Sequence, residues 1–131
     1  MLQAQGLEIT FNPGTPIENH VLRGLDLTIP TGQFVTVIGS NGAGKSTFLN
    51  AVSGDLMVDK GSIKIDGQDV TAKSAWQRAD QVARVFQDPM AGTCEALTIE
   101  ENMALAWKRG AKRGFHFSLT KPLRELFREK L

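Results

Sequence analysis

A glycine-rich segment at residues 39–46, GSNGAGKS, constrains the fold of this chain more than any other feature. The fixed positions of the pattern G-x-x-x-x-G-K-[ST] are filled by Gly39, Gly44, Lys45 and Ser46. The preceding residues 34–38 (FVTVI) are apolar and largely β-branched, which predicts a strand that helices cover on both faces. Residues after the loop predict a helix that ends at Gly54. A strand, a glycine-rich loop and a helix in this order predict an α/β fold.

The residue types of the loop suit the binding of a nucleotide's phosphates. Small residues let successive backbone N–H groups converge on phosphate oxygens, and a helix N-terminus adds partial positive charge. Lys45 is expected to reach the β- and γ-phosphates, and the Ser46 hydroxyl is expected to ligate Mg²⁺. The predicted nucleotide contacts of the loop are Gly39, Ser40, Asn41, Gly42, Ala43, Gly44, Lys45, Ser46 and Thr47.

Alternating and helical patterns predict further elements on both sides of the loop. Alternation of apolar and polar residues predicts strands at 7–11, 25–29 and 62–65, the last entering a turn at Asp66-Gly67. A second buried strand is predicted at 82–86, after a short helix at 74–81. Helices are predicted from the cap Thr98 to Trp107, and in the last segment, where the apolar residues at helical spacing are Leu123, Leu126, Phe127 and Leu131.

The loop alone is shared by several classes of protein. A GTPase needs an Asn-Lys-x-Asp segment and an Asp-x-x-Gly switch, and the sequence contains neither. A small-molecule kinase needs a lid and an acceptor-binding set of Arg or Asp residues, for which the sequence gives no sign.

The loop and four further segments together decide the class, because they resemble the ATP-binding-cassette (ABC) family, the nucleotide-hydrolysing subunits of membrane transporters. VIGSNGAGKSTFLNAVSG resembles the family's Walker A region, and GSIKIDGQDV its next strand and turn. VARVFQDP resembles the entry to the Q-loop, and LTIEENMALA the first helix of the helical subdomain. LRGLDLTIPTGQFVTVIG is similar to the β-rich lead-in. The resemblance implies a P-loop NTPase fold of the ABC ATPase type, with an antiparallel β lead-in and the start of a helical subdomain.

The resemblance also implies roles for two residues outside the loop. Gln87 corresponds to the glutamine that contacts Mg²⁺ or the attacking water, so Lys45 and Gln87 are the candidate catalytic residues and Ser46 and Gln87 the candidate metal ligands. Phe11 lies about where the family has an aromatic residue that stacks on adenine, although an ordinary core phenylalanine is the alternative. The expected domain is residues 1–131, with the β lead-in and P-loop core at 1–88 and the helical subdomain from 89.

Three segments of the family pattern have no counterpart in this sequence: the signature segment, the strand that ends in Asp-Glu, and a later histidine. We therefore expect the N-terminal portion of a cassette, truncated near Leu131 and inactive in hydrolysis by itself. The resemblance implies MgATP, permease subunits and a second, head-to-tail ATP-binding subunit as partners. The alternatives are a non-transport, soluble ABC-family ATPase and a small P-loop kinase. Parts of the sequence are similar to bacterial subunits for uptake of amino-acid-like solutes.

Composition matters here for partners and location. The formal net charge is +1 with 22% charged residues, so nothing in the overall charge favours nucleic acid as a partner. The single cysteine, Cys94, fits a reducing compartment, and the N-terminal residues lack a signal peptide's pattern. We expect a cytoplasmic protein, held peripherally at the inner face of the membrane by permease subunits.

Overall fold

The computed structural model describes residues 1–111 and 119–130, and the chain forms two compact units, Met1–Gln81 and Val82–Leu131. Each unit is considered by itself. The division between a core at 1–88 and a helical subdomain at 89–131 stays a prediction. In the described residues, no helix is both long enough and apolar enough to cross a membrane.

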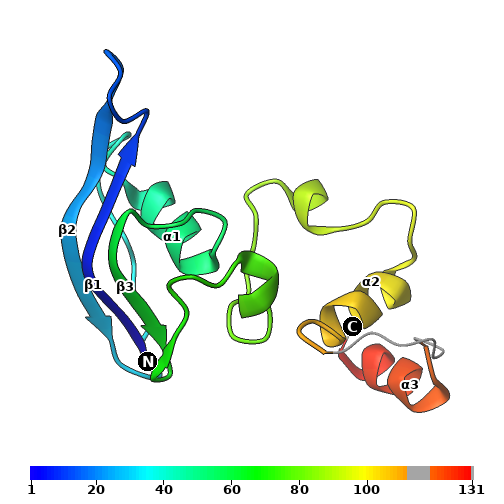
Figure 1. Cartoon of the computed structure of the whole chain (residues 1–131). Helices are drawn as coiled ribbons and strands as arrows, with labels where there is room; N and C mark the ends of the chain where they lie inside the picture. Colours follow the sequence, from blue (N-terminus) through cyan, green and yellow to red (C-terminus); the bar gives the residue numbers. More distant parts are fainter. Residues whose placement is uncertain (112–118, 131) are drawn as a thin grey trace. The chain divides into compact units, whose positions relative to one another are not determined.

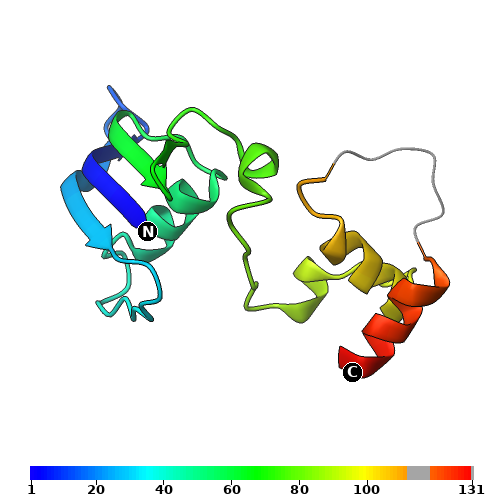
Figure 2. The ribbon, with the colours of Figure 1, turned by 90° about the horizontal axis from the view of Figure 1, so that it is seen from below.

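The first unit is built on a four-stranded antiparallel sheet in the order β2-β1-β3-β4 (Figure 1). The strands are β1 (Leu2–Phe11), β2 (Asn19–Ile29), β3 (Lys60–Ile65) and β4 (Gln68–Asp69). The helix α1 (Lys45–Ser53) lies on one side of the sheet (Figure 2). The predicted β lead-in is thus confirmed as antiparallel, and its first two strands are longer than the alternating segments at 7–11 and 25–29.

The core of this unit lies between α1 and the sheet. Its buried apolar side chains are Ala4, Leu7, Ile9, Leu22, Phe48, Ala51, Ile63, Ile65 and Val70. Residues of β1 separated by three positions share this core because a bulge follows Ala4, where Gly6 has a left-handed φ of 57°. The burial of these side chains holds α1 against the lead-in strands, and α1 begins at the end of the glycine-rich loop.

Local signals were reliable at the turns and caps of the first unit. Asp66 and Gly67 both have positive φ, 48° and 79°, as a two-residue hairpin turn of type I′ requires. Gly54 ends α1 in the left-handed conformation (φ 84°), which confirms the predicted terminator. The short helix predicted at 74–81 forms as a single 3₁₀ turn, η1 (Ala75–Arg78), with Ser74 as its cap.

Two strand predictions are wrong: residues 34–38 and 82–86 lie outside all strands. Phe34 is 95% exposed and Val85 is 96% exposed, although both were expected to be buried. A β-strand is stabilised by hydrogen bonds to a neighbouring strand, and in the described part of the chain no strand pairs with either segment. Apolar, β-branched composition marks a segment as suited to a sheet, but it does not supply the neighbour.

The second unit contains a 3₁₀ turn, η2 (Pro89–Gly92), and two helices, α2 (Ile99–Trp107) and α3 (Lys121–Lys130). Phe127 of α3 is buried, and its ring meets Trp107 of α2 edge to face at a centroid distance of 6.4 Å. Both predicted helices therefore form; Leu131, predicted to belong to the last one, lies outside the described residues.

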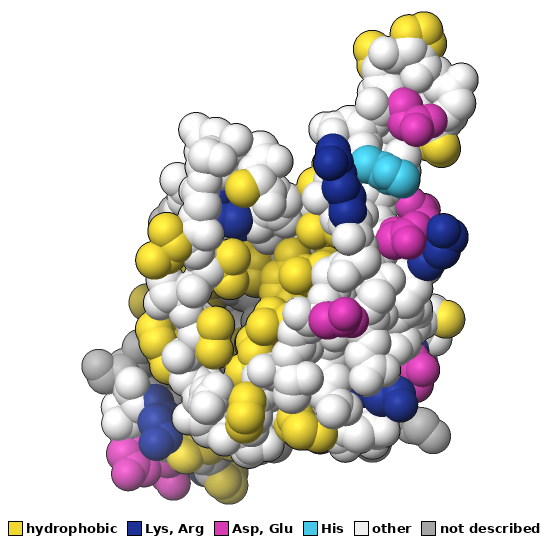
Figure 3. All heavy atoms as spheres, turned by 90° about the vertical axis from the view of Figure 1, so that its left-hand side faces the viewer, with side chains coloured by type: hydrophobic (Ala, Val, Ile, Leu, Met, Phe, Trp, Pro, Cys, Tyr) yellow, Lys and Arg dark blue, Asp and Glu magenta, His cyan; other side chains and the backbone are white. Residues whose placement is uncertain are grey.

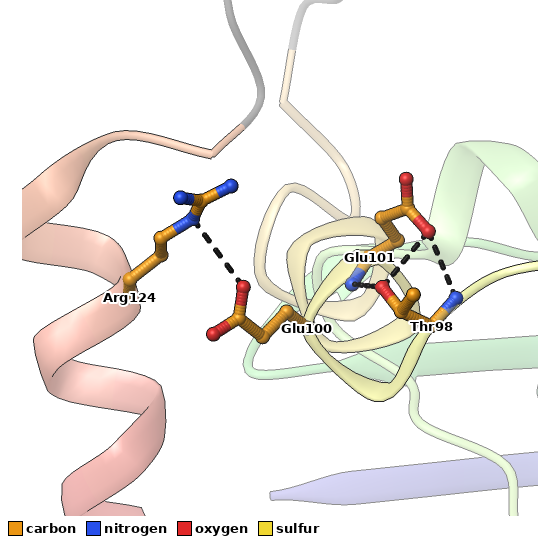
Figure 4. A network of polar contacts seen from close by, with 4 residues as sticks. All are labelled: Thr98, Glu100, Glu101 and Arg124. Carbon is orange, nitrogen blue, oxygen red and sulfur yellow. Dashed lines mark hydrogen bonds and ion pairs between the residues drawn. The ribbon is translucent and has the colours of Figure 1, made fainter.

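The start of α2 is fixed by a capping box (Figure 4). The Glu101 backbone N–H donates to Thr98 Oγ1 at 3.3 Å, and the Thr98 backbone N–H donates to Glu101 Oε2 at 2.8 Å. The Thr98 hydroxyl also donates to Glu101 Oε2. The two hydrogen bonds that this carboxyl accepts from Thr98, first from its backbone N–H and then from its hydroxyl, hold the pKa of Glu101 below its usual range. An ion pair of 3.3 Å from Arg124 Nε to Glu100 Oε2 joins α3 to the same turn. The predicted cap at Thr98 is confirmed.

Candidate functional site

Two backbone carbonyls of the glycine-rich loop bind the side chain of the loop's own lysine. Lys45 Nζ donates to the carbonyl oxygens of Gly39 at 2.7 Å and Ser40 at 2.6 Å. The turn inside the loop is closed by the Ala43 N–H, which donates to the Ser40 carbonyl at 3.2 Å. The Lys45 ammonium is thus held at the centre of the loop by bonds that an anionic ligand could replace.

The backbone of the loop takes conformations that favour glycine. Gly42 and Gly44 have φ of 82° and 84°. A Cβ at Gly44 would also lie 3.2 Å from Leu22 Cδ2 and 3.2 Å from Val21 Cγ1. Glycine at position 44 therefore lets the end of the loop lie directly on β2, and this contact fixes where α1 begins.

The first turn of α1 presents its N–H groups without a capping side chain. Its cap residue is Gly44, and no acidic residue lies in the first turn. The first intrahelical bond runs from the Phe48 N–H to the Gly44 carbonyl at 2.8 Å. The preceding N–H groups lack intrahelical acceptors, so they and the helix dipole produce a positive potential at Lys45, Ser46 and Thr47.

A pocket of about 330 Å³ lies at this end of α1, within the size range of small-molecule sites. The pocket is lined by Phe11, Asn19, Val21, Asn41, Gly42, Ala43, Gly44, Lys45, Ser46 and Thr47. Phe11 ends β1 and is paired in register with Asn19 of β2, and its side chain is 38% exposed. The two strands thus contribute an aromatic ring, an apolar side chain and the amide of Asn19, and the loop and the start of α1 contribute N–H donors and an ammonium group. Separately from this lining, hydrophobic side chains gather around a hollow on the face that Figure 3 draws, where the figure labels no residue.

The structure brings most of the predicted nucleotide contacts to this pocket. Phe11 and residues 41–47 line it, and Gly39 and Ser40 bind the Lys45 ammonium through their carbonyls. Gln87 belongs to the second unit and its predicted role stays a prediction. In the described residues no cluster of three His, Cys, Asp or Glu side chains could hold a metal ion.

Two lining residues, Asn19 and Val21, were missed by sequence reasoning. They belong to the part of β2 that precedes the alternating segment 25–29, next to turn residues. The signal that could have found them is the hairpin itself: a strand that pairs with β1 must place a residue opposite Phe11.

The sequence and the fold were compared with known proteins. The profile of the ABC transporter family matches residues 22–129. A tyrosine transport ATP-binding protein of Clostridioides difficile is 44% identical over 112 residues, which are 84% of this chain and 44% of that protein. An energy-coupling factor transporter ATP-binding protein of Acetivibrio thermocellus is 39% identical over 88 residues, covering 67% of this chain and 31% of the relative.

Solved structures show the same fold. A dimeric, post-hydrolysis ATP-binding cassette bound to ADP and Pi superposes with a TM-score of 0.76 at 25% identity, over 98% of this chain and 55% of that one. A dimeric bacterial ABC transporter cassette superposes with a TM-score of 0.78 at 24% identity, over 98% and 55%. The chain spans about half the length of these structures and less than half that of the two relatives by sequence. With a family profile that matches most of the sequence and a cassette fold that matches its structure, the chain belongs to the ATP-binding domains of the ABC transporter family.

Proposed function

We propose that the pocket at the N-terminal end of α1 binds MgATP. The observation that carries this proposal is that one pocket is lined both by Phe11 at the end of β1 and by the loop with Lys45. A flat aromatic ring suits a nucleotide base. An ammonium group and uncapped N–H donors suit the oxygens of a polyphosphate. The ADP-bound cassette with the same fold supports this choice of ligand.

The residues present fit the chemistry of a magnesium nucleotide. Lys45 binds the β- and γ-phosphates, and the remaining loop N–H groups surround them. Ser46 is exposed at the first turn of α1, and its hydroxyl is the hard oxygen ligand that Mg²⁺ prefers. Bound Mg²⁺ neutralises phosphate charge. Gln87 is a neutral amide that both donates and accepts hydrogen bonds, and we assign it to the Mg²⁺ or attacking-water side of the nucleotide.

For the whole protein we propose an ATPase subunit that couples ATP hydrolysis to solute transport. Its partners are then transmembrane permease subunits and a second ATP-binding subunit, which places it at the cytoplasmic face of the membrane. The dimeric cassette supports the second subunit, and the transport proteins among the relatives support the permease. The 44% identity to a tyrosine transport protein supports an amino-acid-like solute.

Calorimetric titration of the 131-residue chain with ATP, ADP, AMP and adenosine, each with Mg²⁺, tests the nucleotide site. Because the loop contacts the β- and γ-phosphates, ADP and ATP are expected to bind far more tightly than AMP and adenosine. AMP binding as tight as ATP binding would contradict the assignment of the loop, and so would the absence of binding by all four ligands.

Phe11 is expected to contribute to the affinity for the base. Replacing Phe11 with Ala removes the flat ring from the pocket and is expected to cost roughly 1 kcal/mol of nucleotide binding, about a fivefold rise in Kd. Because the base is common to ATP and ADP, both nucleotides should lose the same factor, and Phe11→Trp should bind nearly as the parent does. The matched control is Phe34→Ala, which removes an exposed phenylalanine of the same unit outside the pocket. If Phe11→Ala binds as tightly as Phe34→Ala, Phe11 has only a packing role.

A further inference from the structure

Arg78, the last residue of η1, has a buried guanidinium that binds backbone carbonyls rather than a carboxylate. Only 1% of the Arg78 surface is exposed, although arginine is rarely buried without a charged partner. Nη1 donates to the carbonyls of Ala51 at 2.7 Å and Val52 at 2.8 Å. Nε donates to Lys73 O at 2.8 Å, and Nη2 to Thr71 O at 3.2 Å. One side chain thus joins two separate segments of the first unit.

The first of these segments is the last turn of α1. The carbonyls of Ala51 and Val52 are among the last four of the helix and carry its negative partial charge. Ala51 O also accepts from the Gly54 N–H at 3.3 Å, a donor that Asn50 O shares at 3.1 Å. Burial lowers the pKa of Arg78 and the carboxylate of Asp69 raises it, but a guanidinium stays protonated. A permanent cation therefore lies at the negative end of the helix whose other end lines the pocket.

Gly54 gives a second, independent sign that η1 is fitted closely to this helix end. A Cβ at Gly54 would lie 2.8 Å from the Ala75 backbone nitrogen and 2.9 Å from the Ser74 carbonyl carbon. It would also lie 3.0 Å from Arg78 Nε. The close approach that Gly54 permits is what lets the guanidinium reach the α1 carbonyls.

The first unit ends three residues after Arg78, at Gln81. The Gln81 N–H donates to the Arg78 carbonyl at 2.9 Å, and Gln81 Nε2 donates to Gln68 Oε1 at 2.9 Å. Gln81 is the last residue of the unit, and the candidate residue Gln87 follows six positions later. The last residues of the first unit are therefore held to α1 through Arg78 and to β4 through Gln81.

We propose that Arg78 is a positioning residue for the nucleotide site: it holds α1 by its C-terminal carbonyls, so that the N–H groups at the other end stay aimed at the phosphates. This inference rests on the proposed function, because it needs a nucleotide whose phosphates bind at the N-terminal end of α1.

The test compares Arg78→Lys and Arg78→Met with the control Arg23→Met, in the 131-residue chain with Mg²⁺. Arg23 is exposed on β2, and within the described part of the chain its Nε donates to the His20 carbonyl, so the control removes the same charge without touching α1. A lysine keeps the charge, but one nitrogen cannot reach carbonyls on both segments as the guanidinium fork does. Calorimetry gives Kd for ATP and adenosine, and ¹H–¹⁵N spectra follow the amides of residues 45–47 during titration with pyrophosphate.

Both Arg78 variants are expected to bind ATP roughly tenfold more weakly while adenosine changes by less than about twofold, and the pyrophosphate-induced shifts of residues 45–47 should shrink. Arg23→Met should match the parent chain.

Equal loss for ATP and adenosine, or no loss, would mean that Arg78 only stabilises the fold. If Arg78→Met does not fold, Arg78→Lys and Gly54→Ala take its place, and the loss of ATP affinity is again compared with the loss of adenosine affinity. Gly54→Ala displaces η1 without removing charge. If the parent chain and Arg23→Met bind neither ATP nor pyrophosphate, the proposed nucleotide site itself is wrong, and this inference falls with it.

Discussion

Replacing Lys45 with Ala is expected to weaken ATP binding by about 100-fold or more, equivalent to roughly 2.7 kcal/mol. The ammonium of Lys45 is the positive charge that the structure holds inside the loop, 2.7 Å from the Gly39 carbonyl and 2.6 Å from the Ser40 carbonyl. In the proposed complex it exchanges these neutral acceptors for the negative oxygens of the β- and γ-phosphates. Removing it leaves those oxygens without their counter-charge, whereas adenosine, which has no phosphate, should bind nearly unchanged.

The matched control for this experiment is Lys60→Ala. Lys60 is an exposed lysine of the same unit, paired with Glu8 at 2.9 Å, and a surface ion pair of this kind contributes little to stability. Calorimetry with ATP and adenosine should therefore give the parent values for Lys60→Ala. Losses of equal size for ATP and adenosine in Lys45→Ala would indicate a general disturbance of the loop, and the assignment of Lys45 to the phosphates would be abandoned.

The largest expected effect on stability is that of Gly61→Ala, which should lower the free energy of unfolding of the first unit by about 3 kcal/mol or more. Gly61 lies in β3 opposite the bulge of β1, with a φ of 91°. A Cβ there would lie 2.4 Å from the Gln5 carbonyl oxygen and 2.5 Å from that of Gly6, so the backbones of two strands would have to separate. Both the left-handed conformation and the overlap oppose the substitution.

Gly67→Ala separates these two causes. Gly67 has a similar φ of 79°, but a Cβ there would meet no atom within 4 Å. It should cost only the conformational part, about 1 kcal/mol. Urea unfolding of both variants, followed by far-ultraviolet circular dichroism, measures the difference. Equal midpoints for Gly61→Ala and Gly67→Ala would mean that β1 and β3 yield freely at the bulge, contrary to the close packing described above.

The features that sequence reasoning predicted well are those decided within a few residues. The turn at Asp66-Gly67, the end of α1 at Gly54 and the cap at Thr98 all form as expected. In each case a short side chain or a glycine satisfies nearby backbone groups, so the cause and its effect lie in one short segment. The loop from Gly39 to Ser46 belongs to the same kind, because its pattern fixes glycines where the backbone must bend and a lysine where the charge must lie.

Features that depend on contacts with distant residues could not be predicted from local sequence patterns. The segment 34–38 has the composition of a buried strand, yet it lies outside the sheet because pairing requires a neighbouring strand. Asn19 and Val21 reach the pocket through the hairpin of β1 and β2, and no pattern around either residue marks it as part of a site. No pattern in the sequence predicts the contacts of Arg78, because the carbonyls that it binds come 26 and 27 positions earlier in the chain.

By itself the sequence determined the class of the protein and predicted the loop that is proposed to bind phosphate, because a contiguous loop carries both the backbone geometry and the charge. The tertiary structure alone decided the rest of the pocket, where β1 and β2 bring Phe11, Asn19 and Val21 to the N-terminal end of α1. It also decided how that helix is held, through Arg78 at its opposite end. The physical reason is the same in both cases. Burial and hydrogen bonding between distant segments depend on which segments lie next to each other, and the packing of the whole unit decides this.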